Sequence, residues 1–70
     1  MPKLYSSKEI IKALTARGFI FISQKGSHIK LRKIGSPVLT VIVPAGRKTV
    51  PMGTFKSILR QSNLTEGDFE

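Results

Sequence analysis

The sequence contains no cysteine and no tryptophan, and it has a single histidine, His28. Without cysteine it can form no disulfide bonds and can offer no thiolate ligands to a metal. Only four acidic residues are present, and three of them, Glu66, Asp68 and Glu70, lie among the last five residues. Because there is one histidine and the acidic residues are confined mostly to the C-terminal end, we expect no metal site and no cofactor.

Long apolar runs are also missing. No segment approaches the length that crosses a membrane, and the first residues, MPKLYSSKE, lack the apolar core of a signal peptide. We therefore expect a cytoplasmic protein. The length predicts a single domain over residues 1–70. Because a chain of this size buries only about 60% of its unfolded surface, a ligand is expected on an open face and not in a deep cavity.

Positive charge is what the sequence has in excess. Twelve Lys and Arg residues against four Asp and Glu give a formal net charge of +8. Residues 1–65 carry all twelve basic residues against Glu9 alone, a net charge of +11. Such a surface attracts polyanions, and nucleic acid is the first candidate. Charge alone does not separate RNA from DNA or from an acidic protein, although no recognition-helix pattern supports DNA.

The first predicted element is a helix. Ser6 and Glu9 have the spacing of a capping box, in which each side chain accepts a hydrogen bond from the other's backbone N–H. Apolar residues follow at helical spacing, and Gly18 suits the left-handed turn after a helix. These features predict a helix over about 6–17.

Three short strands and a second helix are predicted next. The strands are expected at 19–22, 27–33 and 38–43, with turn residues between them. The helix is expected to begin near 53–54 and to end at Asn63, and Thr65 to cap a short acidic turn that docks Phe69. The fold class is therefore α+β, α-β-β-β-α, with a three-stranded antiparallel sheet and both helices packed on one face.

The stretch QKGSHIKLRK, residues 24–33, contains the histidine. Side chains alternate between the two faces of a strand, so Ile29 and Leu31 share one face while His28, Lys30 and Arg32 share the other. If the apolar pair meets the helices, His28 stands on the open face beside two cations. The residues alone leave two roles open for it, a proton-transfer catalyst or a hydrogen-bonding contact to a ligand.

The turn before His28 suits a phosphate. Gly26 has no Cβ, so a sugar–phosphate backbone could approach its N–H groups closely, and Ser27 adds a hydroxyl. Basic side chains on both sides of the turn would favour an anion there. The expected substrate-binding residues are Lys25, Gly26, Ser27, Lys30, Arg32 and Lys48.

Three features in this order resemble the HicA family of bacterial toxins: the triplet GSH at 26–28, the Val43-Pro44 pair, and the run GTFKSIL at 53–59. The resemblance extends over 7–69. It implies a small mRNA interferase with a double-stranded-RNA-binding-like fold, inhibited by a HicB antitoxin, and it places the catalytic histidine at His28. Many members carry a second histidine where this sequence has Gly46.

The resemblance implies a metal-independent endoribonuclease that acts on mRNA. His28 would take the proton of a ribose 2′-OH, and that oxygen would attack the adjacent phosphate. The proton for the leaving oxygen would come from a lysine, from water or from the same imidazole. The expected partners are RNA and a HicB-like antitoxin that covers the His28 face. Two other functions remain open, a non-catalytic RNA-binding module of the same fold and an interaction protein that binds an acidic protein.

Overall fold

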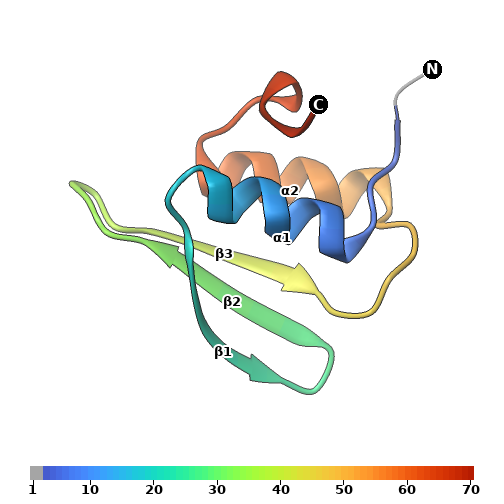
Figure 1. Cartoon of the computed structure of the whole chain (residues 1–70), viewed down its shortest axis with the longest axis horizontal. Helices are drawn as coiled ribbons and strands as arrows, with labels where there is room; N and C mark the ends of the chain where they lie inside the picture. Colours follow the sequence, from blue (N-terminus) through green and yellow to red (C-terminus); the bar gives the residue numbers. More distant parts are fainter. Residues whose placement is uncertain (1–2) are drawn as a thin grey trace.

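The computed structural model describes residues 3–70. The elements follow in the order α1 (Ser7–Ala16), β1 (Ile20–Lys25), β2 (His28–Lys33), β3 (Leu39–Pro44), α2 (Met52–Ser62) and a short 3-10 helix, η1 (Glu66–Phe69). The strands form one antiparallel sheet in chain order, and both helices lie on the same side of it (Figure 1). This architecture confirms the predicted α+β fold with the order α-β-β-β-α.

Helix α1 begins as the sequence predicts. The Ser6 hydroxyl accepts from the Glu9 N–H at 3.1 Å, and the Glu9 carboxylate accepts from the Ser6 N–H at 2.9 Å, which completes the capping box. The hydrogen bond from the Ser6 backbone is the main reason why the pKa of the Glu9 carboxyl lies below its ordinary value. The chain leaves the helix through Gly18, whose φ of +97° favours glycine.

The core lies between the helices and the sheet. The inward positions of β2 and β3 contribute Leu31, Val41 and Val43, which are fully buried. At the other end of the core, the rings of Tyr5, Phe55 and Phe69 lie 5.1–6.1 Å apart, and Phe69 reaches them from η1. The predicted docking of Phe69 by a turn that begins at Thr65 is therefore confirmed. The core is formed by Tyr5, Ile10, Leu14, Phe19, Leu31, Val41, Val43, Val50, Phe55, Ile58 and Phe69.

Strand β1 differs from the prediction of 19–22. It begins one residue later and continues through the polar residues Ser23, Gln24 and Lys25. Phe19 precedes the strand and is buried in the core. The helices lie over the β3 side of the sheet, and β1 is its far edge and packs mainly on β2 (Figure 1). Pairing with β2, and not burial, therefore determines where β1 ends.

Helix α2 lies beside the free edge of β3. The Gln61 side-chain oxygen accepts a hydrogen bond from the Ile42 N–H at 3.0 Å, a backbone group that no fourth strand pairs. The helix ends at Asn63, which has the left-handed conformation expected of a C-terminal cap. This placement makes α2 a wall along one side of the open face. No helix within residues 3–70 is long and apolar enough to cross a membrane.

Candidate functional site

The turn between β1 and β2 presents His28. Gly26 has a φ of +56°, and a Cβ placed on it would meet no atom within 4 Å, so its backbone is open to a ligand. His28 follows as the first residue of β2 and is exposed, with Lys25 and Pro44 as its cross-strand neighbours. The Ser27 carbonyl accepts from the Ala45 N–H at 2.7 Å, which ties the turn to the loop after β3.

His28 lies in a hollow between the outer face of the sheet and α2. Among the residues that the structure describes, the lining of this "His28 hollow" includes one residue with a permanent positive charge, Arg47, and no carboxylate. Polar groups from α2 form its far wall. Its lining residues are His28, Ile42, Pro44, Arg47, Pro51, Thr54, Ser57 and Gln61.

The backbone of Arg47 is held in place by Ser7, the first residue of α1. The Arg47 N–H donates to the Ser7 hydroxyl at 3.0 Å, and the Ser7 N–H donates to the Arg47 carbonyl at 2.9 Å. The Ser7 hydroxyl in turn donates to the carbonyl of Pro44, the last residue of β3. Ser7 is only 3% exposed, so water does not compete for these bonds. The loop that carries Arg47 is therefore fixed at both sides.

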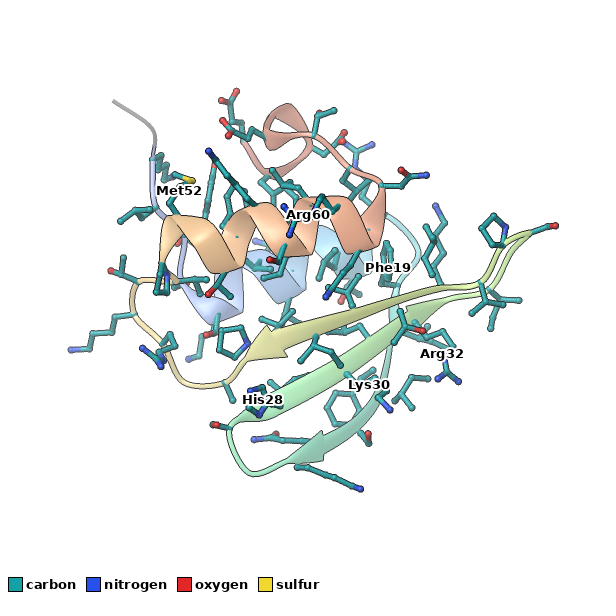
Figure 2. The ribbon with its side chains drawn as sticks, turned by 180° about the vertical axis from the view of Figure 1, so that it is seen from behind. Phe19, His28, Lys30, Arg32, Met52 and Arg60 are labelled. Atoms are coloured by element: carbon teal, nitrogen blue, oxygen red, sulfur yellow. The ribbon has the colours of Figure 1, made fainter. Side chains whose placement is uncertain are left out.

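On the outward side of β2, two basic side chains, Lys30 and Arg32, follow His28. Figure 2 shows His28, Lys30 and Arg32 along the strand, as alternation predicts. At about 3.3 Å per residue, Lys30 is about 7 Å and Arg32 about 13 Å from His28 along the backbone. The Arg32 Nε donates to the Thr40 hydroxyl at 3.4 Å. A phosphate beside His28 is thus closer to Lys25 and Lys30 than to Arg32.

Lys48, which the sequence also predicts in the site, belongs to the loop between β3 and α2 but does not line the His28 hollow. It lines a "second hollow", on the side of the sheet that faces the helices. Arg47 lines both hollows. Gly46 also lines the second hollow and not the His28 hollow. This is the position at which many members of the family that the sequence resembles carry a second histidine. The second hollow is lined by Ser6, Ser7, Lys8, Ile11, Gln24, Ile29, Ala45, Gly46, Arg47 and Lys48.

Sequence reasoning missed Arg47 and the wall from α2. Arg47 lies in a loop whose sequence has no helical or strand periodicity. Its position depends on Ser7, forty residues away in the chain. On α2, Thr54, Ser57 and Gln61 repeat at intervals of three and four residues, the spacing of one helix face. That polar stripe was a usable signal. Arg60 adds to it, because its Nη2 donates to the Ser57 hydroxyl at 3.1 Å.

Negative charge lies elsewhere. Asp68 of η1 pairs with Arg17 at 3.0 Å, and a hydrogen bond from the Thr65 N–H is the main cause that holds the pKa of the Asp68 carboxyl below its ordinary value. Glu9 is engaged in the cap of α1. Figure 1 shows η1 on the opposite side of the helices from the sheet. Within residues 3–70, no three acidic, histidine or cysteine side chains gather as ligands for a metal.

The geometry therefore combines an exposed imidazole, an open glycine turn and an arginine on an anchored backbone beside one hollow. An imidazole can give or take a proton near neutral pH, and fixed cations stabilise negative charge on a bound group. Such an arrangement can bind an anionic ligand and transfer a proton to or from it.

The family comparison agrees with the fold and the turn. The model of the family described as the HicA toxin of bacterial toxin–antitoxin matches residues 7–64. The matched span begins with the first residue of α1 and includes all three strands, α2 and His28. No curated protein matches the chain. Because the family model covers most of the sequence, the chain belongs to the HicA family, the toxins of bacterial toxin–antitoxin systems.

Proposed function

We propose that this toxin is a metal-independent endoribonuclease, an mRNA interferase that cleaves cytoplasmic mRNA with His28 as its one catalytic histidine. The observation that carries the proposal is the exposed imidazole at the mouth of a hollow that also contains Arg47. The open turn at Gly26 lets the RNA backbone come close to that ring.

RNA supplies its own nucleophile for this reaction. His28 takes the proton of the 2′-OH, and the 2′-oxygen attacks the neighbouring phosphorus. The bond from phosphorus to the 5′-oxygen breaks, and the leaving oxygen takes a proton and becomes a 5′-hydroxyl. The other product is a 2′,3′-cyclic phosphate. Proton transfer of this kind contributes about 10²–10⁴-fold to the rate.

The cations around His28 would stabilise the charge that develops on phosphorus. Arg47 lines the hollow, and Lys25 is the cross-strand neighbour of the histidine. Lys30 is next along the same face. Fixed positive groups beside the reacting phosphate lower the barrier because they need no reorganisation. The proton for the leaving oxygen would come from a lysine such as Lys25, from water or from the protonated His28.

A HicB-like antitoxin that covers the His28 face would block this activity. The support is electrostatic and steric: the histidine is exposed, and the body that carries it has a large positive charge. An acidic partner surface laid over Lys25, Lys30 and Arg47 would neutralise the cations and close the hollow to RNA.

A second function fits the same surface. A non-catalytic RNA-binding module would use His28 as a hydrogen-bonding contact and the same cations for phosphates. The absence of a carboxylate beside the imidazole in the described hollow favours this alternative, because many general-base histidines are oriented by an acidic neighbour. Cleavage distinguishes the two functions, and binding does not.

The test compares RNA cleavage by the wild type and by His28→Ala in EDTA, with RNA binding measured on the same samples. We expect the wild type to cut RNA and leave 2′,3′-cyclic phosphate ends. We expect His28→Ala to cut about 10²–10⁴-fold more slowly and to bind RNA nearly as well. A DNA copy of the substrate should remain intact because it has no 2′-OH.

The control is Thr15→Ala, which changes an exposed residue of α1 that lines neither hollow and keeps its carbonyl bond to the Gly18 N–H. It should retain most of the activity. If folded wild type and folded His28→Ala bind RNA equally and neither cuts it, the binding module is the correct function. Cleavage by His28→Ala at the wild-type rate would reject His28 as the general base.

A further inference from the structure

The second hollow is lined by apolar and basic residues that have no part in the proposed reaction, apart from Arg47. Its floor is aliphatic, formed by Ile11 of α1, Ile29 of β2 and Ala45 of the loop. Three cations, Lys8, Arg47 and Lys48, lie around this floor. A site for phosphate alone gains nothing from an aliphatic floor. A ligand with both an apolar face and a phosphate fits the two parts of the lining together, and a nucleotide has both.

Gln24 adds a hydrogen-bonding group to the same hollow. It pairs with Ile29 across the two strands, so both side chains lie on the face towards the helices. The Gln24 Nε2 donates to the Gly26 carbonyl at 3.2 Å, and the amide makes no other hydrogen bond within residues 3–70. Its oxygen and its second N–H are therefore available to a ligand. An amide with one free acceptor and one free donor can pair with the N6 amino group and N7 of adenine, and this two-ring base covers more of the aliphatic floor than uracil does.

The second hollow adjoins the catalytic site that we propose. Arg47 lines both hollows, and only the loop after β3 lies between them. The Ala45 N–H, beside the aliphatic floor, binds the carbonyl of Ser27, the residue before His28. A strand whose phosphate contacts Arg47 beside His28 can therefore place a neighbouring base on the other side of the loop.

We infer that the second hollow is a nucleobase subsite, which holds the base of a nucleotide adjacent to the phosphate at His28 and prefers adenine over uracil. The inference rests on the proposed RNA substrate and deepens it by naming a specificity site. The aliphatic floor packs against the flat face of the base, and the Gln24 amide binds its edge. The rim cations hold the flanking phosphates.

The experiment measures binding of 2′-O-methyl oligonucleotides, which have no free 2′-OH and cannot be cut by the proposed reaction. The probes are a hexamer of uridine and six copies in which one position carries adenine, with a parallel set carrying one abasic position. We expect adenine at one position to raise the affinity roughly tenfold, and an abasic sugar at the same position to lower it.

Three variants locate the effect. Ala45→Leu fills the aliphatic floor and should abolish both the gain from adenine and the loss from the abasic sugar. Gln24→Leu removes the amide from an exposed position and should reduce the gain from adenine but keep the loss from the abasic sugar. The matched control is Ala16→Leu, which adds the same atoms to an exposed position on α1 that lies outside this hollow. It should bind every probe as the wild type does.

Two results would overturn the inference. One is a wild type whose affinity is the same for all adenine and abasic positions. The other is a folded Ala45→Leu or Gln24→Leu variant that keeps the full preference for adenine. Neither depends on catalysis. A protein that cuts RNA but shows no position dependence would refute the subsite alone, and one that shows the dependence but cuts no RNA would refute the proposed reaction alone.

Discussion

Phe19 and Phe21 are two residues apart and occupy opposite environments. Phe19 is 1% exposed in the core, and Phe21 is 61% exposed on the edge strand. Both lie in the same apolar run of the sequence, FIFI, so hydropathy does not distinguish them. The difference arises because the helices pack mainly against β3 and β1 is the far edge of the sheet, whereas the residue just before β1 still reaches the core (Figure 1).

This difference predicts two very unequal mutational effects. Phe19→Ala should lower the free energy of unfolding by about 3–5 kcal/mol, because it leaves a cavity in a small core. Phe21→Ala should lower it by less than about 1 kcal/mol, because water already contacts most of the ring. Urea denaturation of both variants measures the difference, and a Phe19→Ala protein that is unfolded without urea also agrees with it. Equal losses in the two variants would contradict the packing described here.

The positions of the site residues were predictable from the sequence where the residues follow the alternation of a β-strand. Alternation in β2 is sufficient to place His28, Lys30 and Arg32 on one face and Leu31 in the core, and the structure agrees. Arg47 was not predictable in this way. Its position depends on hydrogen bonds between a loop and the buried Ser7, and such contacts between distant parts of a chain leave no periodic trace in the sequence.

At the scale of the elements, two capping boxes fix the starts of α1 and η1. Ser6 and Glu9 form one, and Thr65 and Asp68 form the other. In each box a carboxylate accepts a hydrogen bond from the backbone N–H of the capping residue, and this bond is the main reason why the pKa values of Glu9 and Asp68 are lowered. Both boxes could be predicted from the sequence, since their hydrogen bonds are local.

These pKa shifts predict an acid-dependent loss of stability. A carboxyl with a lowered pKa in the folded state stabilises the fold at pH values above its unfolded pKa, about 4. That contribution is lost as the pH falls through the lower folded value. The double variant Glu9→Gln, Asp68→Asn keeps an oxygen acceptor in each box but cannot titrate. Between pH 6 and pH 3 it should lose less stability than the wild type in urea denaturation. An equal loss in both proteins would show that the boxes do not contribute to the acid response.

The limits of the elements were less predictable than their order. The sequence indicates a strand that stops at Ile22, because Ser23, Gln24 and Lys25 are polar. The structure continues β1 through all three, since each has a partner on β2. An edge strand that is exposed on both sides needs pairing but not apolar residues, so composition underestimates its length.

At the scale of the whole molecule, negative charge is concentrated away from the outer face of the sheet. The acidic residues Glu66, Asp68 and Glu70 are at or next to η1, on the far side of the helices from the sheet (Figure 1). The outer face of the sheet carries His28, Lys30 and Arg32 (Figure 2). The chain measures only 34 × 28 × 18 Å, so this separation acts across a thin body. A polyanion that approaches the molecule should therefore be oriented towards the sheet face.

The orientation can be tested through the salt dependence of RNA binding. The logarithm of the association constant falls linearly with the logarithm of the salt concentration. For single-stranded RNA the slope is about −0.7 for each phosphate that the protein neutralises. Lys25→Ala removes a cation beside His28 and should make the slope shallower by about 0.7. Lys12→Ala removes the same charge from α1, in a hollow that also contains Glu9, Asp68 and Glu70, and should leave the slope unchanged. Equal changes in the two variants would mean that RNA responds to the total charge of the molecule and not to the sheet face.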